Sequence, residues 1–314
     1  MVENPTSVGL FAGAGGMAEG MKQAEFDIRS LVDIEDYCCE TLRTNFDTEV
    51  VQADLTDAEY DSITPNAVDV VTGGPPCQDF SVANRFSRGG EKTNLVFVFA
   101  DWVRHLNPNI FVMENVVGME STDDVLERLI DEFENMGYSI QNMKLNAKDF
   151  GVPQHRERII LVGSKVGPIT EPTATVDEPV TVGEVFEKYP SVSAGETDES
   201  VPNHRAPNHQ KKTVERIKNT DWGESLFESW GSKVRLDPND VAPTLKAGKR
   251  ANYHFGHPYD NRGLTIRERA EIMSFPEDFE FCGTVTEMRT QTGNAIPPKM
   301  ATAIMSSVKE KLVE

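Results

Sequence analysis

Cysteine and long apolar runs are both scarce in this sequence. Among 314 residues there are four cysteines, Cys38, Cys39, Cys77 and Cys282. No two of them have the C-x-x-C spacing typical of zinc sites, so we predict no metal site and no disulfide framework. The longest apolar run, Leu95–Val103, is interrupted by Asp101 and is shorter than the ~18 residues that a membrane span needs. The first residues carry neither the basic nor the apolar segment of a secretory signal. These absences predict a cytoplasmic protein in a reducing compartment, with no membrane partner.

Positive charge is scarce as well. The chain has 31 Lys and Arg against 51 Asp and Glu, a net charge of −20, which taken alone argues against a protein that binds a polyanion. One segment differs, because Asn203–Lys218 carries several cations and the single acid Glu215. Its cations are Arg205, Lys211, Lys212, Arg216 and Lys218. Such a segment is typical of a surface that faces phosphates, although a solvated helix face is the alternative.

The apolar pattern predicts an α/β protein. At 314 residues with 38% hydrophobic content, the chain can form one large domain or two unequal ones. Its first 165 residues alternate short apolar runs with helical patterns, which favours βα units around a mainly parallel sheet. The expected strands are Ser7–Phe11, Ser30–Ile34, Val50–Ala53, Val68–Thr72, Asn109–Met113, Ser139–Leu145 and Arg158–Val162. The expected helices are Met17–Ala24, Asp36–Asn45, Thr93–Leu106, Asp123–Met136, an exposed Thr265–Met273 and a terminal Ala295–Leu312. Residues 167–202 are expected to form a connector.

A glycine-rich turn follows the first expected strand. Phe11-Ala12-Gly13-Ala14-Gly15-Gly16 leads directly into a helix, where glycines let a ligand approach the backbone at the positive helix end. Asp33 and Asp54 end the next two strands and could accept from ribose hydroxyls and an adenine amino group. Three such positions at successive strand ends favour an adenosine-bearing cofactor. A dinucleotide is less favoured because the turn has the pattern Gly-x-Gly-Gly. Helix or turn caps are the alternative for each Asp.

A cysteine follows a buried strand in the segment Gly73–Ser81. Two prolines fix the backbone before Cys77, and the strand end places it at the ligand-binding edge of a parallel sheet. A free cysteine is commonly a small buried hydrophobe. Here its neighbours are Pro76 and Gln78, which favours a nucleophile that would react as the thiolate.

Two further strand ends supply polar partners. Glu114 ends one strand, and Arg156 and Arg158 come at the start of another, where alternation predicts that they share a face. The blander alternatives are a helix-capping acid and ion pairs with Glu157. Together with Cys77, this set suits covalent chemistry on a planar heterocycle. The thiolate adds to the ring, the acid protonates a ring nitrogen and the guanidinium holds an exocyclic oxygen.

These segments, in this order, resemble the DNA (cytosine-5) methyltransferase family. The matching segments are Phe-x-Gly-x-Gly-Gly at 11–16, Pro-Pro-Cys-Gln-x-Phe-Ser at 75–81, Glu-Asn-Val at 114–116, Gln-x-Arg-x-Arg at 154–158 and Gly-Asn-Ala-Ile-Pro-Pro at 293–298, with support from 235–244 and 264–276. The match runs from Ser7 to about Ala301, and only residues 167–230 lack a clear counterpart. The resemblance implies a Rossmann-like S-adenosylmethionine-dependent methyltransferase sheet with a smaller target-recognition domain. We expect residues 1–166 plus 290–314 to form the cofactor-binding and catalytic domain, and 167–289 the recognition domain.

The resemblance also implies a role for each matching residue. Cys77 would add to C6 of cytosine, Glu114 would hydrogen-bond N3 and the amino group, and Arg158 would contact O2 with Arg156 nearby. S-adenosyl-L-methionine would supply the methyl group. Its implied binding residues are Phe11, Gly13, Ala14, Gly16, Asp33, Ile34, Asp54, Leu55, Pro76, Asn294 and Ala295. Ile34 is a departure, since the family often has an aromatic residue there against the adenine.

Double-stranded DNA is the implied partner. Because a duplex shields C5 and C6, such enzymes flip the cytosine out of the stack, and Gln78 and Ser81 lie on the loop that family members close over it. The expected DNA-binding residues are Gln78, Ser81, Arg205, Lys211, Lys212 and Arg235, with Lys246, Lys249 and Arg250 also in the recognition region. We further expect a monomer, with a cognate restriction endonuclease sharing the site as a possible second partner.

Two other functions compete with this one. A tRNA cytosine-5 methyltransferase would carry a Cys-Phe-Thr signature, yet no cysteine occurs between Cys77 and Cys282. A silent DNA-binding regulator on the same scaffold is disfavoured because each expected chemical group is present. The charge of −20 suggests a halophile-like acidic protein that works in concentrated salt, with an ordinary acidic protein that has a basic cleft as the alternative.

Overall fold

In a computed structural model, the chain divides into two units. The structure describes residues 4–59, 67–76, 87–88, 91–92, 95–116, 125–227, 233–247 and 255–314. The first unit comprises Met1–Leu145, Glu157–Thr173 and Ala301–Glu314, and the second comprises Asn146–Arg156 and Ala174–Met300. Residues 146–156 and 290–300, expected in the first domain, cluster with the second unit, and residues 167–173, expected in the second domain, cluster with the first unit.

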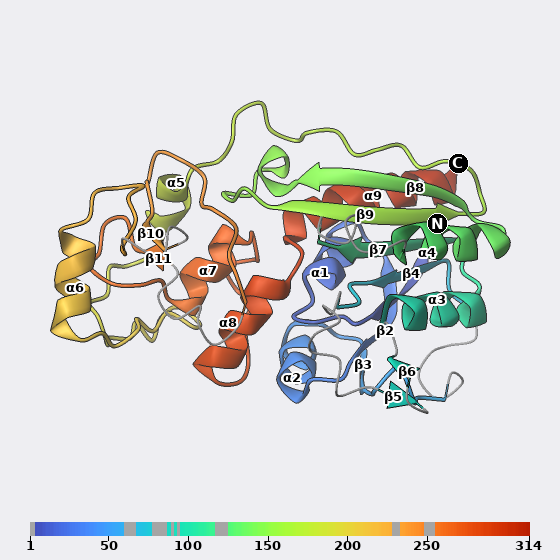
Figure 1. Ribbon diagram of the computed structural model, residues 1–314, viewed down its shortest axis with the longest axis horizontal. Helices are drawn as coiled ribbons and strands as arrows, with labels where there is room; N and C mark the ends of the chain where they lie inside the picture. The colour runs from blue at the N-terminus through green and yellow to red at the C-terminus, as the bar shows by residue number, and fades with distance from the viewer. Residues whose placement is uncertain are drawn as a thin grey trace. The chain divides into compact units, whose positions relative to one another are not determined.

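A seven-stranded sheet forms the centre of the first unit, in the order β3-β2-β1-β4-β7-β9-β8 (Figure 1). Its strands are β1 (Thr6–Leu10), β2 (Asp27–Asp33), β3 (Glu49–Gln52), β4 (Val70–Gly73), β7 (Ile110–Asn115), β8 (Ser139–Asn146) and β9 (Glu157–Ser164). The pairs from β3 to β7 are parallel, whereas β9 pairs with β7 in antiparallel register. Two short strands, β5 (Ser87–Arg88) and β6 (Glu91–Lys92), pair separately. The prediction of a mainly parallel α/β sheet is confirmed.

Helices pack on this sheet through apolar and small residues. They are α1 (Gly16–Gln23), α2 (Asp36–Asn45), α3 (Leu95–Leu106), α4 (Val125–Asn135) and α9 (Pro298–Val313). An aromatic cluster of Phe99, Phe111, Phe133 and Tyr138 joins α3 and α4 to β7, with the Phe111 and Phe133 ring centroids 4.0 Å apart. Gly163 on β9 lies opposite Phe111, where a β-carbon would come within 2.0 Å of the ring. Only glycine leaves room for that ring.

The C-terminal helix α9 packs against α1 at the start of the chain. A β-carbon on Gly20 would lie 2.5 Å from the Ala301 β-carbon and 2.7 Å from its carbonyl carbon. Lys309 of α9 also forms an ion pair of 2.8 Å with Glu25, just after α1. Residues about 280 positions apart in sequence thus complete one layer of the first unit.

The second unit is built from short elements and many capped turns. These are a 3₁₀ helix (Ala147–Phe150), α5 (Val182–Phe186), α6 (Lys211–Lys218), α7 (Ile266–Ile272), α8 (Val285–Asn294) and the paired strands β10 (Val234–Arg235) and β11 (Phe255–Gly256). Capping boxes begin α5, α7 and α8, each with a Thr at the N-cap and a Glu three residues later.

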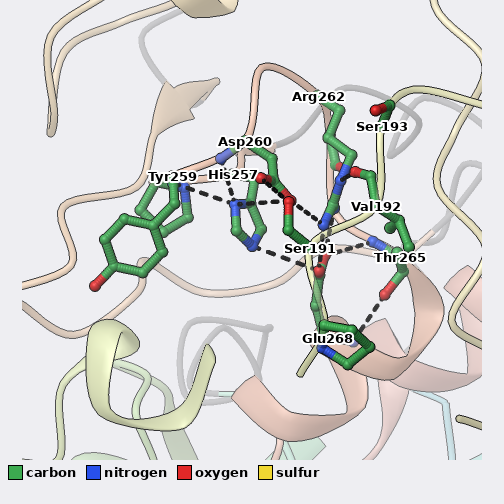
Figure 2. Close-up of polar contacts among 12 residues, drawn as sticks. Ser191, Val192, Ser193, His257, Tyr259, Asp260, Arg262, Thr265 and Glu268 are labelled. Carbon is green, nitrogen blue, oxygen red and sulfur yellow. Dashed lines mark hydrogen bonds and ion pairs between the residues drawn. The ribbon is translucent and has the colours of Figure 1, made fainter. Parts of the chain in front are cut away.

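The prediction of an exposed helix at Thr265–Met273 is wrong about exposure, because every residue of α7 is buried. Its charged side chains have internal partners. Glu268 accepts two hydrogen bonds from Arg262, at 2.8 and 2.9 Å (Figure 2). Arg267 donates to the carbonyls of Glu277 and Phe279, and Arg269 donates to Thr292. The alternating charges resemble a solvated face, yet here they hold the surrounding loops together.

Candidate active site

Two of the predicted catalytic side chains meet at the end of the β7–β9 pair. The Arg158 Nε lies 2.6 Å from the Glu114 Oε1, and the two side chains are only 10% and 13% exposed. Glu114 is near the end of β7 and Arg158 near the start of β9, which runs antiparallel beside it. A buried carboxylate and guanidinium therefore lie together where the sequence predicted them.

The chain that leads to Cys77 begins next to this pair. Asn115 Nδ2 donates a hydrogen bond of 3.1 Å to the carbonyl of Pro75, which ties the end of β7 to the segment that leaves β4. A β-carbon at Gly74 would lie 3.3 Å from the Glu114 Oε2, so glycine gives the carboxylate room. Cys77 itself, with Gln78 and Ser81, lies outside the described residues.

Asn115 is a positioning residue that sequence reasoning did not single out. It is 4% exposed, and its Oδ1 also accepts from the Val116 backbone N–H at 2.8 Å. The sequence could have indicated this role, because Asn115 directly follows Glu114 and neighbouring residues of a strand point to opposite faces. It can therefore hold the Pro75 backbone while Glu114 faces the other way.

Arg156 has surroundings quite different from those of Arg158. It is fully buried in the second unit, where its guanidinium donates to the carbonyls of Leu245, Gly293 and Ala295 at 3.1, 2.8 and 2.9 Å. The structure thus does not bring the two predicted arginines together. These contacts hold the backbone on both sides of Asn294, and a catalytic role of Arg156 stays a prediction.

The glycine-rich turn has the backbone that glycine permits. Gly13 and Gly15 have φ values of 56° and 88°, and Phe11, with a φ of 49°, also adopts the left-handed conformation. A β-carbon on Gly15 would lie 2.7 Å from the Phe46 ring, whereas one on Gly13 would meet nothing within 4 Å. Gly15 is also the N-cap of α1 and supplies no capping side chain. The turn is therefore tightly packed on one side and open at Gly13.

The Asp33 carboxylate holds this turn to the end of β2. It accepts hydrogen bonds from the backbone N–H groups of Gly13 at 2.7 Å and Glu35 at 2.9 Å. Burial raises the pKa of Asp33, and these hydrogen bonds oppose that shift. Each carboxylate oxygen has a second lone pair with which it can accept from a ligand hydroxyl.

Asp54 caps the turn after β3. Its Oδ1 accepts from the Thr56 backbone N–H at 2.9 Å and from the Thr56 hydroxyl at 2.7 Å. The following residue, Leu55, is buried, and its carbonyl accepts from the Trp102 indole at 3.0 Å. The capping role that the sequence left open for Asp54 is thus present in the structure.

These residues fit an adenosine-bearing cofactor. Ile34 is 45% exposed beside Asp33 and Phe11 is half-buried, so apolar surface for a ring lies close to carboxylate acceptors. Ala14 and Gly16 are buried within the turn, and Pro76 is exposed. The remaining predicted residues, Asn294 and Ala295, belong to the second unit, where Asn294 is exposed and Ala295 is half-buried.

The predicted DNA-binding cations lie in the second unit. Arg205, Lys211 and Lys212 are exposed, the two lysines in the first turn of α6. Arg235 differs, because its guanidinium donates to the carbonyls of Thr220 and Pro258 at 3.1 and 2.9 Å. Its contact with DNA stays a prediction.

Comparison with known proteins defines the family. The family model described as C-5 cytosine-specific DNA methylase matches residues 6–310. The chain is 37% identical to the Type II methyltransferase M1.HphI of Haemophilus parahaemolyticus, over 96% of this chain and 86% of that protein. It is 32% identical to the Type II methyltransferase M.NgoFVII of Neisseria gonorrhoeae, over 97% and 86%. A crystal structure of a candidate DNA modification methyltransferase encoded within an E. coli prophage superimposes with a TM-score of 0.80 at 24% identity, over 99% of this chain and 100% of that chain.

The chain belongs to the C-5 cytosine-specific DNA methylase family. The resemblance seen in the sequence, the Rossmann-like methyltransferase fold and the assignment as a DNA (cytosine-5) methyltransferase are thereby confirmed. Family and fold imply S-adenosylmethionine as methyl donor and DNA as substrate. No helix among the described residues is long and apolar enough to cross a membrane.

Proposed function

We propose that the protein methylates cytosine within one specific duplex DNA sequence, through a covalent adduct between Cys77 and C6 of a flipped-out base. The single observation that carries this mechanism is the Glu114–Arg158 pair, with 2.6 Å between Nε and Oε1. Glu114 lies beside Gly74, and the next residue, Asn115, holds the carbonyl of Pro75, two residues before the proposed nucleophile.

The chemistry follows from the groups in this set. The Cys77 thiolate forms a bond to C6, and the C5=C6 electron pair moves onto C5 while Glu114 hydrogen-bonds N3 and the amino group. Arg158, held by Glu114, is suited to the O2 oxygen because a guanidinium donates in a fixed plane. When bound, S-adenosylmethionine supplies the methyl group that C5 takes up. Loss of the C5 proton to a base then expels the thiolate and restores the ring.

Binding of the cofactor is assigned to the first unit. Asp33 would accept from the ribose hydroxyls while it holds Gly13, and Asp54 would accept from the adenine amino group. Ile34 and Phe11 would cover the ring. The open space at Gly13 supports close approach of a ligand to this turn. Asn294 and Ala295 are proposed as further cofactor-binding residues, and Arg156, which donates to the carbonyls of Gly293 and Ala295, as a positioning residue for them.

The second unit is assigned to target recognition. Its exposed cations Arg205, Lys211 and Lys212 support this role, in an otherwise acidic chain. The relatives named as Type II methyltransferases favour a function in restriction–modification, with an endonuclease that shares the site. They also favour DNA over tRNA as substrate. We propose that the enzyme acts as a monomer.

Covalent trapping tests the mechanism. With S-adenosylmethionine present, duplex DNA that contains 5-fluorocytosine at the target should form an adduct that survives denaturation, because fluorine cannot leave as the proton does. Cys77→Ser should abolish the adduct, whereas Cys282→Ser is the matched control and should retain it. The target itself is found by sequencing 5-methylcytosine in plasmid DNA after expression. Trapping on tRNA but on no DNA would refute the assignment.

A further inference from the structure

A cavity of about 330 Å³ lies in the second unit and is lined by cations. Its lining residues are Arg205, Ala206, Pro207, Asn208, His209, Val285 and Arg289. This lining includes two arginines and a histidine but no Asp or Glu, in a chain with 51 acids and 31 bases. The lining of the cavity is thus positively charged, whereas the chain as a whole is negatively charged.

The segment that carries Arg205 and Asn208 has a fixed backbone. Ala206 N–H donates to the Glu196 carbonyl at 2.8 Å, and the Pro207 carbonyl accepts from Gly195 N–H at 3.2 Å. Two acids of this neighbouring segment have local partners: Glu196 accepts from the Ser193 backbone N–H at 2.9 Å, and Asp198 accepts from the Ser200 backbone N–H at 2.8 Å. The side chains of the lining segment therefore start from a preorganised loop.

His209 lines the cavity as a neutral ring. Its Nε2 accepts from the Gly263 backbone N–H at 2.9 Å, so the ring proton is on Nδ1. Burial lowers the pKa of His209, and the nearby charges of Arg289 and Arg262 lower it further. At neutral pH the ring is therefore uncharged.

Arg289 brings positive charge to the cavity from helix α8, where it is 7% exposed. Burial and this same charge lower the pKa of the fully buried Arg269 to about 9. Glu287, the acid two residues before Arg289, accepts from the backbone N–H of Thr284 at 2.7 Å and caps α8. Arg289 thus has a second cation, Arg269, close to it and lies in a cavity whose lining has no acid, which favours the binding of an anion.

We propose that this cavity binds a phosphate group of the DNA backbone, with Arg205, Arg289 and Asn208 as donors. The proposal rests on the proposed function in that it takes duplex DNA as the substrate. Guanidinium groups match phosphate oxygens with two parallel hydrogen bonds. A phosphate held here would fix the position of the duplex without reading its sequence. Free inorganic phosphate has the same chemistry and is the other source that must be distinguished.

The salt dependence of DNA binding tests the source of the phosphate. For the full chain, each lost phosphate contact reduces the slope of log K against log salt by about 0.9. Arg205→Gln should show this reduction equally on target and unrelated duplexes, with unchanged affinity for S-adenosylmethionine. Arg29→Gln is the matched control, because Arg29 is an exposed arginine of the first unit paired with Asp27, and it should keep the wild-type slope.

Thermal melting tests the cavity itself. Sodium phosphate should raise the melting temperature of the wild type above that in sodium chloride of equal ionic strength. Arg205→Gln and Asn208→Ala should reduce this difference, and Arg29→Gln should not. Both substitutions change exposed residues, so the folded protein remains available for measurement.

Each outcome separates the two sources. A reduced slope together with reduced protection by phosphate supports a backbone phosphate. If Arg205→Gln reduces the stabilisation by phosphate but leaves the salt slope of DNA binding unchanged, the cavity binds a free anion and the DNA assignment is wrong. If Arg205→Gln changes neither measurement, the cavity is not an anion site. Trapping of wild-type protein on 5-fluorocytosine DNA reports the proposed function independently, because it depends on Cys77 and not on this cavity.

Discussion

Glu114 lies against Arg158 in a largely buried pair, so its substitution should affect chemistry more than binding. Glu114→Gln keeps the shape but cannot supply an acid proton, and we expect turnover to fall by about 100-fold or more. Single-turnover methyl transfer on the target duplex measures this, with cofactor affinity expected to change little.

The control for this prediction is Glu157→Gln. Glu157 is 38% exposed and pairs with Lys144 at 3.4 Å, so its replacement should leave turnover near the wild-type value. Equal losses in the two variants would mean that charge alone, and not the acid at position 114, is responsible.

The two arginines show where alternation along a strand stops predicting the position of a side chain. Alternation along a strand predicted that Arg156 and Arg158 share a face. β9 begins at Glu157, so Arg156 precedes the strand and the alternation does not apply to it. Its partners are the carbonyls of Leu245, Gly293 and Ala295, and no local pattern could reveal contacts with residues about 90 to 140 positions away.

At the level of elements, Gly20 is where helix α1 meets α9. In an open helix, Gly→Ala would stabilise by about 1 kcal/mol. At position 20 the added carbon would lie 2.7 Å from the Ala301 carbonyl carbon, so we expect Gly20→Ala to destabilise the protein by about 1–3 kcal/mol. Urea denaturation gives the free energy of unfolding.

Glu40→Ala in helix α2 of the same unit is the comparison for Gly20→Ala. Glu40 is exposed, so this change should alter the free energy of unfolding by only a few tenths of a kcal/mol. A stabilised Gly20→Ala protein would mean that α1 and α9 do not pack this closely.

The stability of the fold around His257 should depend on pH. The ring stacks on Phe186 with centroids 5.0 Å apart, and burial lowers its pKa from 6.5 to about 4, although Glu268 opposes the shift. The unfolded chain therefore binds this proton more tightly, so stability falls as pH drops from about 6.5 towards 4. Between pH 6.5 and 5 the loss is about 2 kcal/mol.

Denaturation at several pH values measures this effect in the full chain. His257→Gln should flatten the dependence in that window. Phe186→Leu removes the stacking partner but not the titrating group, so it should lower stability while a clear dependence remains. An unchanged slope in His257→Gln would assign the acid sensitivity to other groups.

Elements were predicted well where apolar periodicity decides the structure. The α2 range Asp36–Asn45 was predicted to the residue, and the strands shifted by at most a few positions. The prediction that α7 is exposed was wrong, because its Arg and Glu residues give the pattern of a surface helix. Their partners, such as Arg262 for Glu268 and the Phe279 carbonyl for Arg267, come from loops whose conformation sequence patterns do not specify.

For the whole molecule, the net charge of −20 predicts stabilisation by salt. At about 1 M salt the Debye length is near 3 Å, so repulsion among surface carboxylates is largely screened. We expect the melting temperature and methyl transfer to hold or rise between about 0.1 and 3 M KCl, with binding then depending less on counterion release.

Sucrose is the control for this prediction. It stabilises folded proteins by exclusion from their surface and does not screen charge, so it should not reproduce the response at low KCl. Melting temperature and activity that both decline steadily with KCl would exclude the halophile-like interpretation, while the methyltransferase family would stand.

The contact between α1 and α9 also has a consequence for synthesis of the chain on the ribosome. Gly20 meets Ala301, so α1 is made long before its partner. At roughly 5–20 residues per second, the intervening segment takes about 15–60 s to translate. During that interval the surface of α1 that α9 will cover remains open, and the first unit can be completed only after the second unit has been synthesised. Slow or interrupted translation should therefore prolong the period in which the nascent chain is vulnerable to aggregation and proteolysis.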